Sequence, residues 1–146
     1  ETGTISITNP EMTRFLITLR QGAEFVLKSL GDMVGGELFI PKIPAFTVAD
    51  IANLVAPDCA WDTIGLRPGE KMHEVLIPED EARNVMEFEN HFVIQPIQTF
   101  WGNKIGIKGG SKCPDNFTYA SNINSVRFSD EELKLLLKDF IPSQSI

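Results

Sequence analysis

A stripe of apolar residues spaced three and four apart limits what the first long element of this 146-residue chain can be. Such spacing places the side chains on one face of an α-helix, whereas a strand would need every second residue. The sequence therefore predicts an amphipathic helix over residues 11–30, with Gly31 ending it. The residues of the stripe are Met12, Phe15, Leu16, Leu19, Ala23, Val26, Leu27 and Leu30.

Short segments typical of β-strands alternate with helical segments along the rest of the chain. The strand segments are rich in apolar and β-branched residues and several end at Pro or Asn. They cover residues 4–8, 37–41, 61–66 and 85–94. This alternation predicts the α/β fold class, with α+β as the alternative.

Two helix starts carry local sequence signals. Thr47 and Asp50 have the spacing of a capping box, and Pro57 ends the helix that follows. Ser129 is followed by three acidic residues, which favour a helix N-terminus. This pattern predicts a C-terminal helix over about 129–140. A further short helix is predicted at residues 72–76.

Composition excludes several classes of protein. The chain is 42% hydrophobic and 23% charged, which indicates a soluble globular protein, and its length fits one domain over residues 1–146. A glycine- and lysine-rich stretch predicts a flexible loop at about 95–116.

No apolar run approaches the roughly 20 residues of a membrane span. The net charge of −7 argues against nucleic acid, which needs a basic face. Cys59 and Cys113 lack the spacing of a disulfide framework or a zinc site, so we expect reduced thiols in the cytoplasm.

The run Arg67-Pro68-Gly69-Glu70 is the first candidate for a ligand contact. Arginine offers a planar fork of donors that matches two phosphate oxygens at once. Pro68 restricts the backbone around it, and Gly69 lets a ligand approach the main chain closely. If Glu70 begins a helix, its free amides would favour a diphosphate, and its carboxylate could accept from ribose hydroxyls. The alternative is an ordinary turn with a solvated arginine.

Arg14 is the second candidate. It lies beside the apolar stripe, so its side chain either extends to solvent or points into a cleft as a phosphate ligand. His73 and Glu74 are neighbours and point in different directions on a helix or a strand, so they do not form an acid–base pair. We expect a structural or rim role for His73, and we assign no catalytic, cofactor-binding or metal-binding residue.

Three longer motifs stand in a fixed order along the chain. They are Ile-Thr-Asn-Pro-Glu-Met-Thr-Arg-Phe at 7–15, Gly-Glu-Leu-Phe-Ile-Pro-Lys-Ile-Pro at 36–44 and Ile-Gly-Leu-Arg-Pro-Gly-Glu-Lys-Met-His-Glu at 64–74. Together they closely resemble the inverting UDP-N-acetylglucosamine 4,6-dehydratases, which are extended short-chain dehydrogenases of bacterial polysaccharide biosynthesis. The resemblance runs from about residue 4 to about residue 137, and residues 117–122 contribute to it.

The resemblance implies a substrate-binding lobe that follows an NADP-binding Rossmann half. It implies that Arg14, Arg67 and Glu70 contact the UDP-sugar, while NADP (or NAD) and the catalytic residues belong to the other half. The implied reaction removes hydride from C4 of the sugar, eliminates water across C5–C6 and returns the hydride to C6 with inversion at C5. This reaction leads toward pseudaminic acid and related surface sugars.

The chain itself lacks the sequence marks of that Rossmann half. It has no glycine-rich turn between a strand and a helix, and Tyr119 is followed four residues later by Ile123 where a Tyr-x-x-x-Lys pair would need lysine. We therefore expect a fragment that is inactive alone. The expected partners are a UDP-sugar, the missing Rossmann half and further copies of the same protein, with no nucleic acid and no membrane. Two alternatives stay open: a non-catalytic module that binds a nucleotide-sugar or a partner, and part of a dehydratase that retains configuration at C5.

Overall fold

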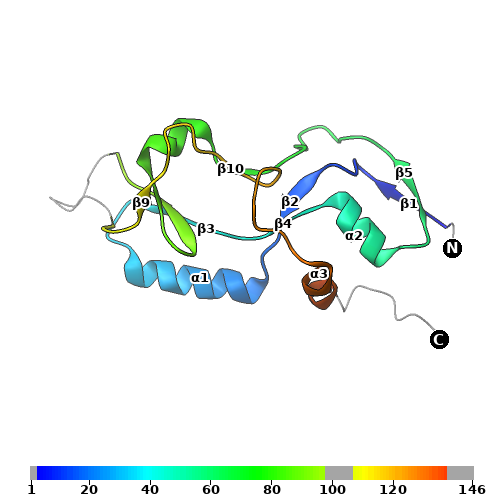
Figure 1. The fold of residues 1–146 in the computed structure, drawn as a ribbon, viewed down its shortest axis with the longest axis horizontal. Helices are drawn as coiled ribbons and strands as arrows, with labels where there is room; N and C mark the ends of the chain where they lie inside the picture. Colours follow the sequence, from blue (N-terminus) through cyan, green and yellow to red (C-terminus); the bar gives the residue numbers. More distant parts are fainter. Residues whose placement is uncertain (1–2, 98–106, 138–146) are drawn as a thin grey trace. The chain divides into compact units, whose positions relative to one another are not determined.

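The computed structural model describes residues 3–97 and 107–137, and it has the mixed α/β character that the sequence predicts (Figure 1). The chain divides into two compact units, each built from separated segments. Unit 1 contains Glu1–Leu16, Pro44–Glu74 and Ser121–Ile146, and unit 2 contains Ile17–Ile43 and Val75–Ala120. The chain thus passes between the units four times.

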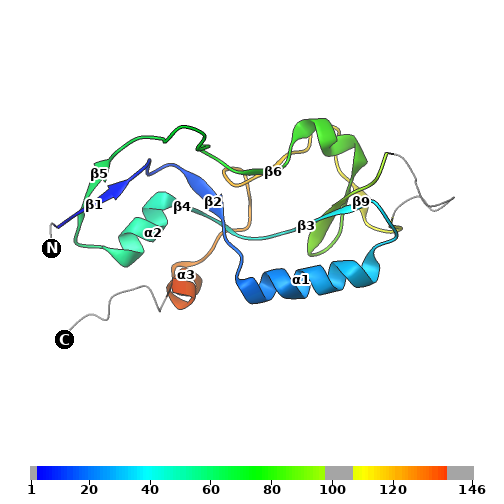
Figure 2. The ribbon, with the colours of Figure 1, turned by 180° about the vertical axis from the view of Figure 1, so that it is seen from behind.

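Unit 1 is built from two pairs of strands and two helices. One pair is parallel and the other antiparallel, and β2 and β4 lie side by side in Figure 2. The elements are β1 (Thr4–Ile7) with β5 (Ala60–Thr63), β2 (Thr13–Phe15) with β4 (Ala45–Thr47), α2 (Val48–Val55) and α3 (Asp130–Leu137). An isolated bridge also joins Ala45 to Arg127, which brings the segment before α3 to the edge of β4.

Unit 2 holds a four-stranded antiparallel sheet in the order β3-β8-β7-β9, with a separate pair of strands and α1. Ile77, Val85 and Val93 are fully buried and form the centre of its core. The elements are α1 (Leu19–Asp32), β3 (Leu38–Pro41), β6 (Val75–Ile77), the 3-10 helix η1 (Glu79–Asn84), β7 (Val85–Glu87), β8 (His91–Ile94), β9 (Ser111–Lys112) and β10 (Tyr119–Ala120).

The predicted helix over residues 11–30 is wrong over its first eight residues. Residues 13–15 form β2, which pairs with β4, and α1 begins only at Leu19. The helix starts there because the Thr18 hydroxyl accepts from the Gln21 amide while the Gln21 side chain accepts from the Thr18 amide. The end is also later than predicted, since α1 passes Gly31 and ends at Asp32.

Two further predictions need correction. The segment around Met72 is not helical, because residues 75–77 form β6 and pair with β10. The single strand predicted over 85–94 is a hairpin of β7 and β8, which turns between residues 87 and 91. Tertiary pairing decides such short segments more strongly than local pattern does.

The local capping signals are confirmed. The Thr47 hydroxyl accepts from the Asp50 amide at 3.0 Å, and α2 follows it. The Ser129 hydroxyl accepts from the Glu132 amide at 3.2 Å, and α3 follows. The predicted strands near residues 4–8 and 37–41 are observed as β1 and β3. Residues 98–106 of the predicted loop and 138–140 of the predicted last helix lie outside the described residues.

Helix α1 presents two different sides. Phe25 meets the imidazole of His91 in unit 2, whereas a second row of apolar side chains is exposed to solvent, and none of the helix's residues is fully buried. We call this row the α1 stripe, and it consists of Leu19, Val26, Leu27 and Leu30. Between the two sides run the ion pairs Arg20–Glu24 at 2.8 Å and Lys28–Asp32 at 2.9 Å.

His91 lies inside a cluster of aromatic rings in unit 2. Its ring stacks on Phe88 with centroids 4.8 Å apart and on Phe39 at 5.9 Å, and the edge contact with Phe25 is at 6.2 Å. Only 8% of the residue is exposed. The imidazole therefore packs as an aromatic ring that holds α1 against the sheet.

This packing predicts a pH dependence of stability. Burial lowers the pKa of His91 from its ordinary value of 6.5, Lys28 and Lys42 lower it further, and Asp32 opposes them. The unfolded chain then takes up the proton more readily, so the free energy of unfolding falls as the pH drops below about 6.5. We expect thermal unfolding between about pH 7.5 and 5.5 to shift more in the wild type than in His91→Phe. Equal shifts in both proteins would show that His91 contributes no such dependence.

Candidate functional site

The Arg67–Glu70 segment forms a closed, exposed turn in unit 1. The Glu70 amide donates to the Arg67 carbonyl at 3.0 Å, and the Arg67 amide donates to Oε2 of Glu70 at 2.8 Å. Gly69 has φ of +86°, a left-handed conformation that side chains with a Cβ adopt only at a cost. No helix begins at Glu70. The segment is a turn, so it does not offer the free amides of a helix N-terminus to a diphosphate.

Arg67 is exposed. The bond to Oε2 of Glu70 comes from the Arg67 backbone amide, so it does not occupy the side chain. The guanidinium can thus approach an anionic ligand from solvent. Glu70 is closer to a structural role than the sequence suggested, because its carboxylate stabilises the turn that presents Arg67. Its second oxygen, Oε1, is the atom that could accept from a ligand hydroxyl.

Arg14 lies on β2 and is held on two sides. Its Nη1 donates to the Thr13 carbonyl at 2.7 Å and to the Met72 carbonyl at 3.3 Å, and its Nε lies 3.5 Å from Oε1 of Glu74. The side chain is 25% exposed. Protein groups therefore fix the Arg14 side chain, and its contact with a phosphate stays a prediction.

A chain of buried polar groups lies directly behind Arg14. The Thr13 hydroxyl is 2.8 Å from Nδ1 of His73 and 2.6 Å from the Ser121 hydroxyl. The Ser121 hydroxyl also accepts from the Glu74 amide at 2.9 Å, and the Ser121 amide donates to the Glu74 carbonyl at 2.8 Å. Sequence reasoning identified His73 only as a rim or structural residue and did not single out Ser121.

Tyr119, the single tyrosine, has a structural role. Its hydroxyl accepts from the Ile43 amide at 2.9 Å and lies 3.0 Å from the Ile43 carbonyl, to which it donates. Burial raises the pKa of this phenol, with the backbone hydrogen bond opposing, so the phenolate is disfavoured. These hydrogen bonds hold Tyr119 to the Ile43 backbone within unit 2, and such a phenol does not suit proton transfer to a substrate.

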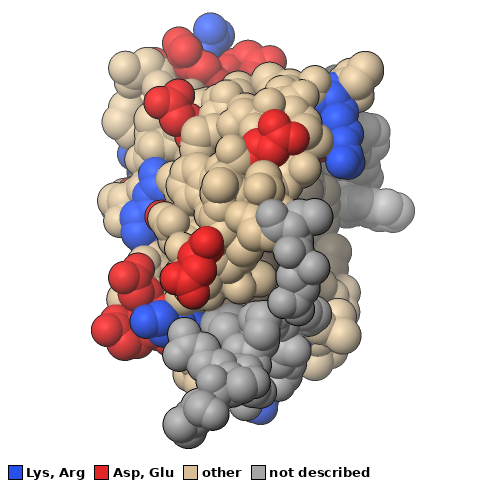
Figure 3. Space-filling model, turned by 90° about the vertical axis from the view of Figure 1, so that its right-hand side faces the viewer, with Lys and Arg blue, Asp and Glu red and all other residues tan. Residues whose placement is uncertain are grey.

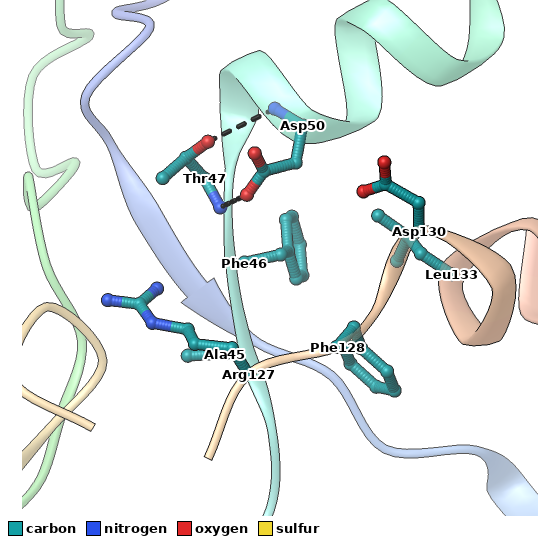
Figure 4. Close-up of a pocket in the computed structure, with 8 residues that line it drawn as sticks. All are labelled: Ala45, Phe46, Thr47, Asp50, Arg127, Phe128, Asp130 and Leu133. Atoms are coloured by element: carbon teal, nitrogen blue, oxygen red, sulfur yellow. Dashed lines mark hydrogen bonds between the residues drawn. The ribbon is translucent and has the colours of Figure 1, made fainter. Parts of the chain in front are cut away.

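A pocket of about 300 Å³ lies elsewhere in unit 1, between β4 and the start of α3 (Figure 4). In this view the Arg127 guanidinium and the Asp130 carboxylate lie on opposite sides of the Phe46 ring. No motif marked this pocket, because its walls come from segments that are far apart in sequence. The lining residues are Ala45, Phe46, Thr47, Asp50, Arg127, Phe128, Asp130 and Leu133.

The paired glycines of the described residues do not form a dinucleotide-binding turn. A dinucleotide turn joins a strand to a helix through glycines. Here Gly35 and Gly36 lead into strand β3, and Gly109 and Gly110 lead into β9. Within the same residues there is no group of three or more His, Cys, Asp or Glu side chains placed to hold a metal ion.

Surface charge and helix length limit other kinds of site. On the face drawn in Figure 3, acidic and basic side chains are interspersed among uncharged ones without one broad basic area. None of the helices in residues 3–97 and 107–137 combines the length and the apolar character needed to cross a membrane.

Comparison with known proteins agrees with the resemblance that the motifs carry. Residues 1–96 match the family model described as polysaccharide biosynthesis protein. The chain is 41% identical over 136 residues to a UDP-N-acetylglucosamine 4,6-dehydratase (inverting) of Campylobacter jejuni, covering 88% of this chain and 40% of that protein. An uncharacterized membrane protein of Methanocaldococcus jannaschii is 33% identical over 149 residues, covering 94% of this chain and 41% of that protein.

A solved structure extends the comparison to the fold. The chain superposes on Pen from Bacillus thuringiensis with a TM-score of 0.73 at 28% identity, covering 95% of this chain and 41% of that one. The fold is therefore an established α/β arrangement that occurs within longer chains. The protein belongs to the polysaccharide biosynthesis protein family, and the resemblance to inverting UDP-N-acetylglucosamine 4,6-dehydratases is confirmed. The chain spans about 40% of the length of these curated relatives.

Substitution of a glycine in the turn and of a glycine in α1 should have opposite effects on stability. Gly69→Ala places a Cβ at φ +86°, where no neighbouring atom obstructs it, so the cost is backbone strain of about 1–2 kcal/mol. Gly69→Asn should cost less, because asparagine tolerates this conformation. Gly22→Ala, at an open position in the first turn of α1, should stabilise by about 0.5–1 kcal/mol. Denaturant unfolding measures all three, and a Gly69→Ala variant as stable as the wild type would contradict the observed turn.

Proposed function

We propose that this chain is the nucleotide-sugar-binding portion of an NADP-dependent UDP-N-acetylglucosamine 4,6-dehydratase of bacterial surface-sugar biosynthesis. The observation that supports this most is the exposed Arg67 on a closed Arg-Pro-Gly-Glu turn, within a chain 41% identical to a protein of that name. The portion alone is inactive on this proposal, and formation of the 4-keto sugar by the isolated 146 residues would contradict that part.

The chemistry of the proposed site is binding rather than catalysis. Arg67, presented to solvent, clamps the diphosphate of UDP, and Arg14 supports it from β2. Glu70 accepts from a ribose hydroxyl through the oxygen that the turn leaves available. The NADP (or NAD) that accepts and returns the hydride is bound by another part of the complete protein, since the paired glycines of the described residues do not form a dinucleotide-binding turn. The product class, pseudaminic acid precursors, is part of the same proposal.

The compartment proposed is the cytoplasm. Cys59 and Cys113 are both free, and Cys113 is buried. Burial is the main cause that raises the pKa of the Cys113 thiol, which keeps it protonated and unreactive. Two unpaired cysteines are typical of a reducing compartment.

A non-catalytic nucleotide-sugar-binding module is the second candidate. The same turn and the same arginine serve both functions, so binding of UDP cannot separate them. Activity of the complete protein separates them, because only the dehydratase forms a 4-keto product. The alternative of a C5-retaining dehydratase is tested by the configuration at C5 of that product.

Replacing Arg67 tests the proposed diphosphate contact. Arg67→Ala should weaken UDP binding by roughly tenfold to a hundredfold, because a charge-assisted hydrogen-bond pair is lost. Arg67→Lys should recover only part of the affinity, since an ammonium keeps the charge without the two-donor fork. The loss should raise KM with little change in kcat, because the diphosphate is bound equally in ground and transition states.

Calorimetric titration of UDP and steady-state kinetics on the complete protein make this measurement. Arg83→Ala removes the same charge from the exposed 3-10 helix η1 and serves as the matched control. Unchanged UDP affinity in Arg67→Ala would remove Arg67 from the site. A fall in kcat with an unchanged KM would assign Arg67 to the chemistry instead.

The exposed α1 stripe tests the proposal that another part of the complete protein packs against these 146 residues. Leu19 is 92% and Leu27 69% exposed, although helices of folded proteins normally bury such a row. The curated relatives are long enough to supply the cover, because this chain spans only 40% of them. On this proposal the Rossmann half packs on the stripe, and copies of the isolated chain associate through it.

Leu27→Gln should therefore have a different effect in the isolated chain and in the complete protein. In the isolated chain it should reduce self-association measured by light scattering, because an exposed apolar side chain is removed. In the complete protein it should lower the free energy of unfolding by about 2–4 kcal/mol, because a buried leucine is lost. Glu24→Gln, on the charged side of α1, should be nearly neutral in both. A neutral Leu27→Gln in the complete protein would show that the stripe stays exposed there.

A further inference from the structure

The buried hydroxyls behind Arg14 form a network that joins three separated segments of unit 1. Thr13 is 4% exposed and Ser121 is fully buried, while His73 is half-buried. Their hydrogen bonds connect β2, the segment that follows the Arg67–Glu70 turn, and the segment that follows β10. Such a network is satisfied only when all of its members are in place.

The tautomer of His73 decides which hydroxyl of the network donates. The Thr13 hydroxyl has one proton and two partners, the Ser121 hydroxyl and Nδ1 of His73. If Thr13 donates to His73, Ser121 must donate to Thr13; if His73 donates to Thr13, either hydroxyl can donate to the other. The Ser121 oxygen meanwhile accepts from the Glu74 amide in both cases. Removing any one hydroxyl leaves a buried partner without its hydrogen bond.

The network fixes the atoms that hold Arg14. The Met72 carbonyl accepts from the Thr13 amide at 3.0 Å and also from Nη1 of Arg14. The Glu74 backbone is tied to Ser121 at both its amide and its carbonyl, and the Glu74 carboxylate lies beside Nε of Arg14. The guanidinium of Arg14 therefore takes its position from a backbone segment that Thr13 and Ser121 hold in place.

We propose that Thr13, His73 and Ser121 are positioning residues for nucleotide-sugar binding, which act through Arg14 and the 72–74 segment rather than by touching the ligand. This inference rests on the proposed function, since it assigns a role relative to the UDP site. It extends the site from Arg14 to the buried hydroxyls that orient this arginine. A ligand-binding arginine whose position is fixed before binding loses less conformational freedom on binding.

A purely structural role makes a different prediction. A residue that only stabilises the fold lowers stability whatever stands at position 14, and any effect on UDP affinity adds to that of Arg14→Ala. A residue that acts through Arg14 has no effect on UDP affinity once Arg14 is gone. A double-mutant cycle on UDP affinity therefore separates the two roles.

The experiment measures UDP affinity by calorimetry on the complete protein with Thr13→Val, Thr13→Ser, Arg14→Ala and the double variant Thr13→Val/Arg14→Ala. Thr13→Val keeps the shape of the side chain and removes the hydroxyl, while Thr13→Ser keeps the hydroxyl. Thr63→Val, at an exposed position of β5 in the same unit, is the matched control. Thermal unfolding of each variant is recorded alongside.

We expect Thr13→Val to weaken UDP binding about fivefold, the loss of one oriented hydrogen-bonding group. Thr13→Ser and Thr63→Val should bind as the wild type does, and the double variant should bind no more weakly than Arg14→Ala alone. The inference is overturned if Thr13→Val binds like the wild type, or if its loss adds in full to that of Arg14→Ala. A wild type that does not bind UDP would instead overturn the proposed function itself.

The half-buried His73 provides a second test if Thr13→Val does not fold. His73→Asn keeps a hydrogen-bonding atom near the position of Nδ1, whereas His73→Leu removes it. We expect His73→Leu to weaken UDP binding and His73→Asn to restore most of the affinity. Equal affinities of these two variants would overturn the role of the Thr13–His73 hydrogen bond.

Discussion

Ser121 has no exposed surface, so every hydrogen bond of its hydroxyl must be made inside the protein. It meets that requirement with Thr13 on β2 and with the Glu74 amide, and its own amide donates to the Glu74 carbonyl. These bonds hold the 72–74 segment to β2, and Arg14 takes its position from the same atoms. The Arg67–Glu70 turn ends two residues before Met72, and its own hydrogen bonds are separate from those of Ser121.

The two arginines are held in different ways, and the difference matters for an acidic chain with a net charge of −7. Arg14 is paired with Glu74 and with backbone carbonyls, and it adds a fixed positive charge beside β2. Arg67 is exposed on a turn, and its backbone amide, not its side chain, donates to Glu70. The guanidinium is therefore available to a ligand. A locally positive site on an acidic surface can still attract a diphosphate, because local geometry and not net charge sets the field there.

The parts of this structure that the sequence could predict are those with local causes. The helix starts after Thr47 and Ser129 depend on side chains that bond amides three residues away, so they are readable from the sequence. The apolar spacing before Leu19 was misleading, because β2 pairs with a strand at least 30 residues away along the chain. The Arg67 turn was visible in its proline and glycine. Its buried support was not, since Thr13 and Ser121 are 108 residues apart and no motif joins them.

The most direct test of this account is a crystal structure of the complete protein with UDP bound. The account predicts that the diphosphate lies within about 3 Å of the Arg67 guanidinium, with Glu70 near the ribose and Arg14 still bonded to the Met72 carbonyl. UDP bound away from the Arg67–Glu70 turn, with the Arg67 side chain still in solvent, would contradict the account.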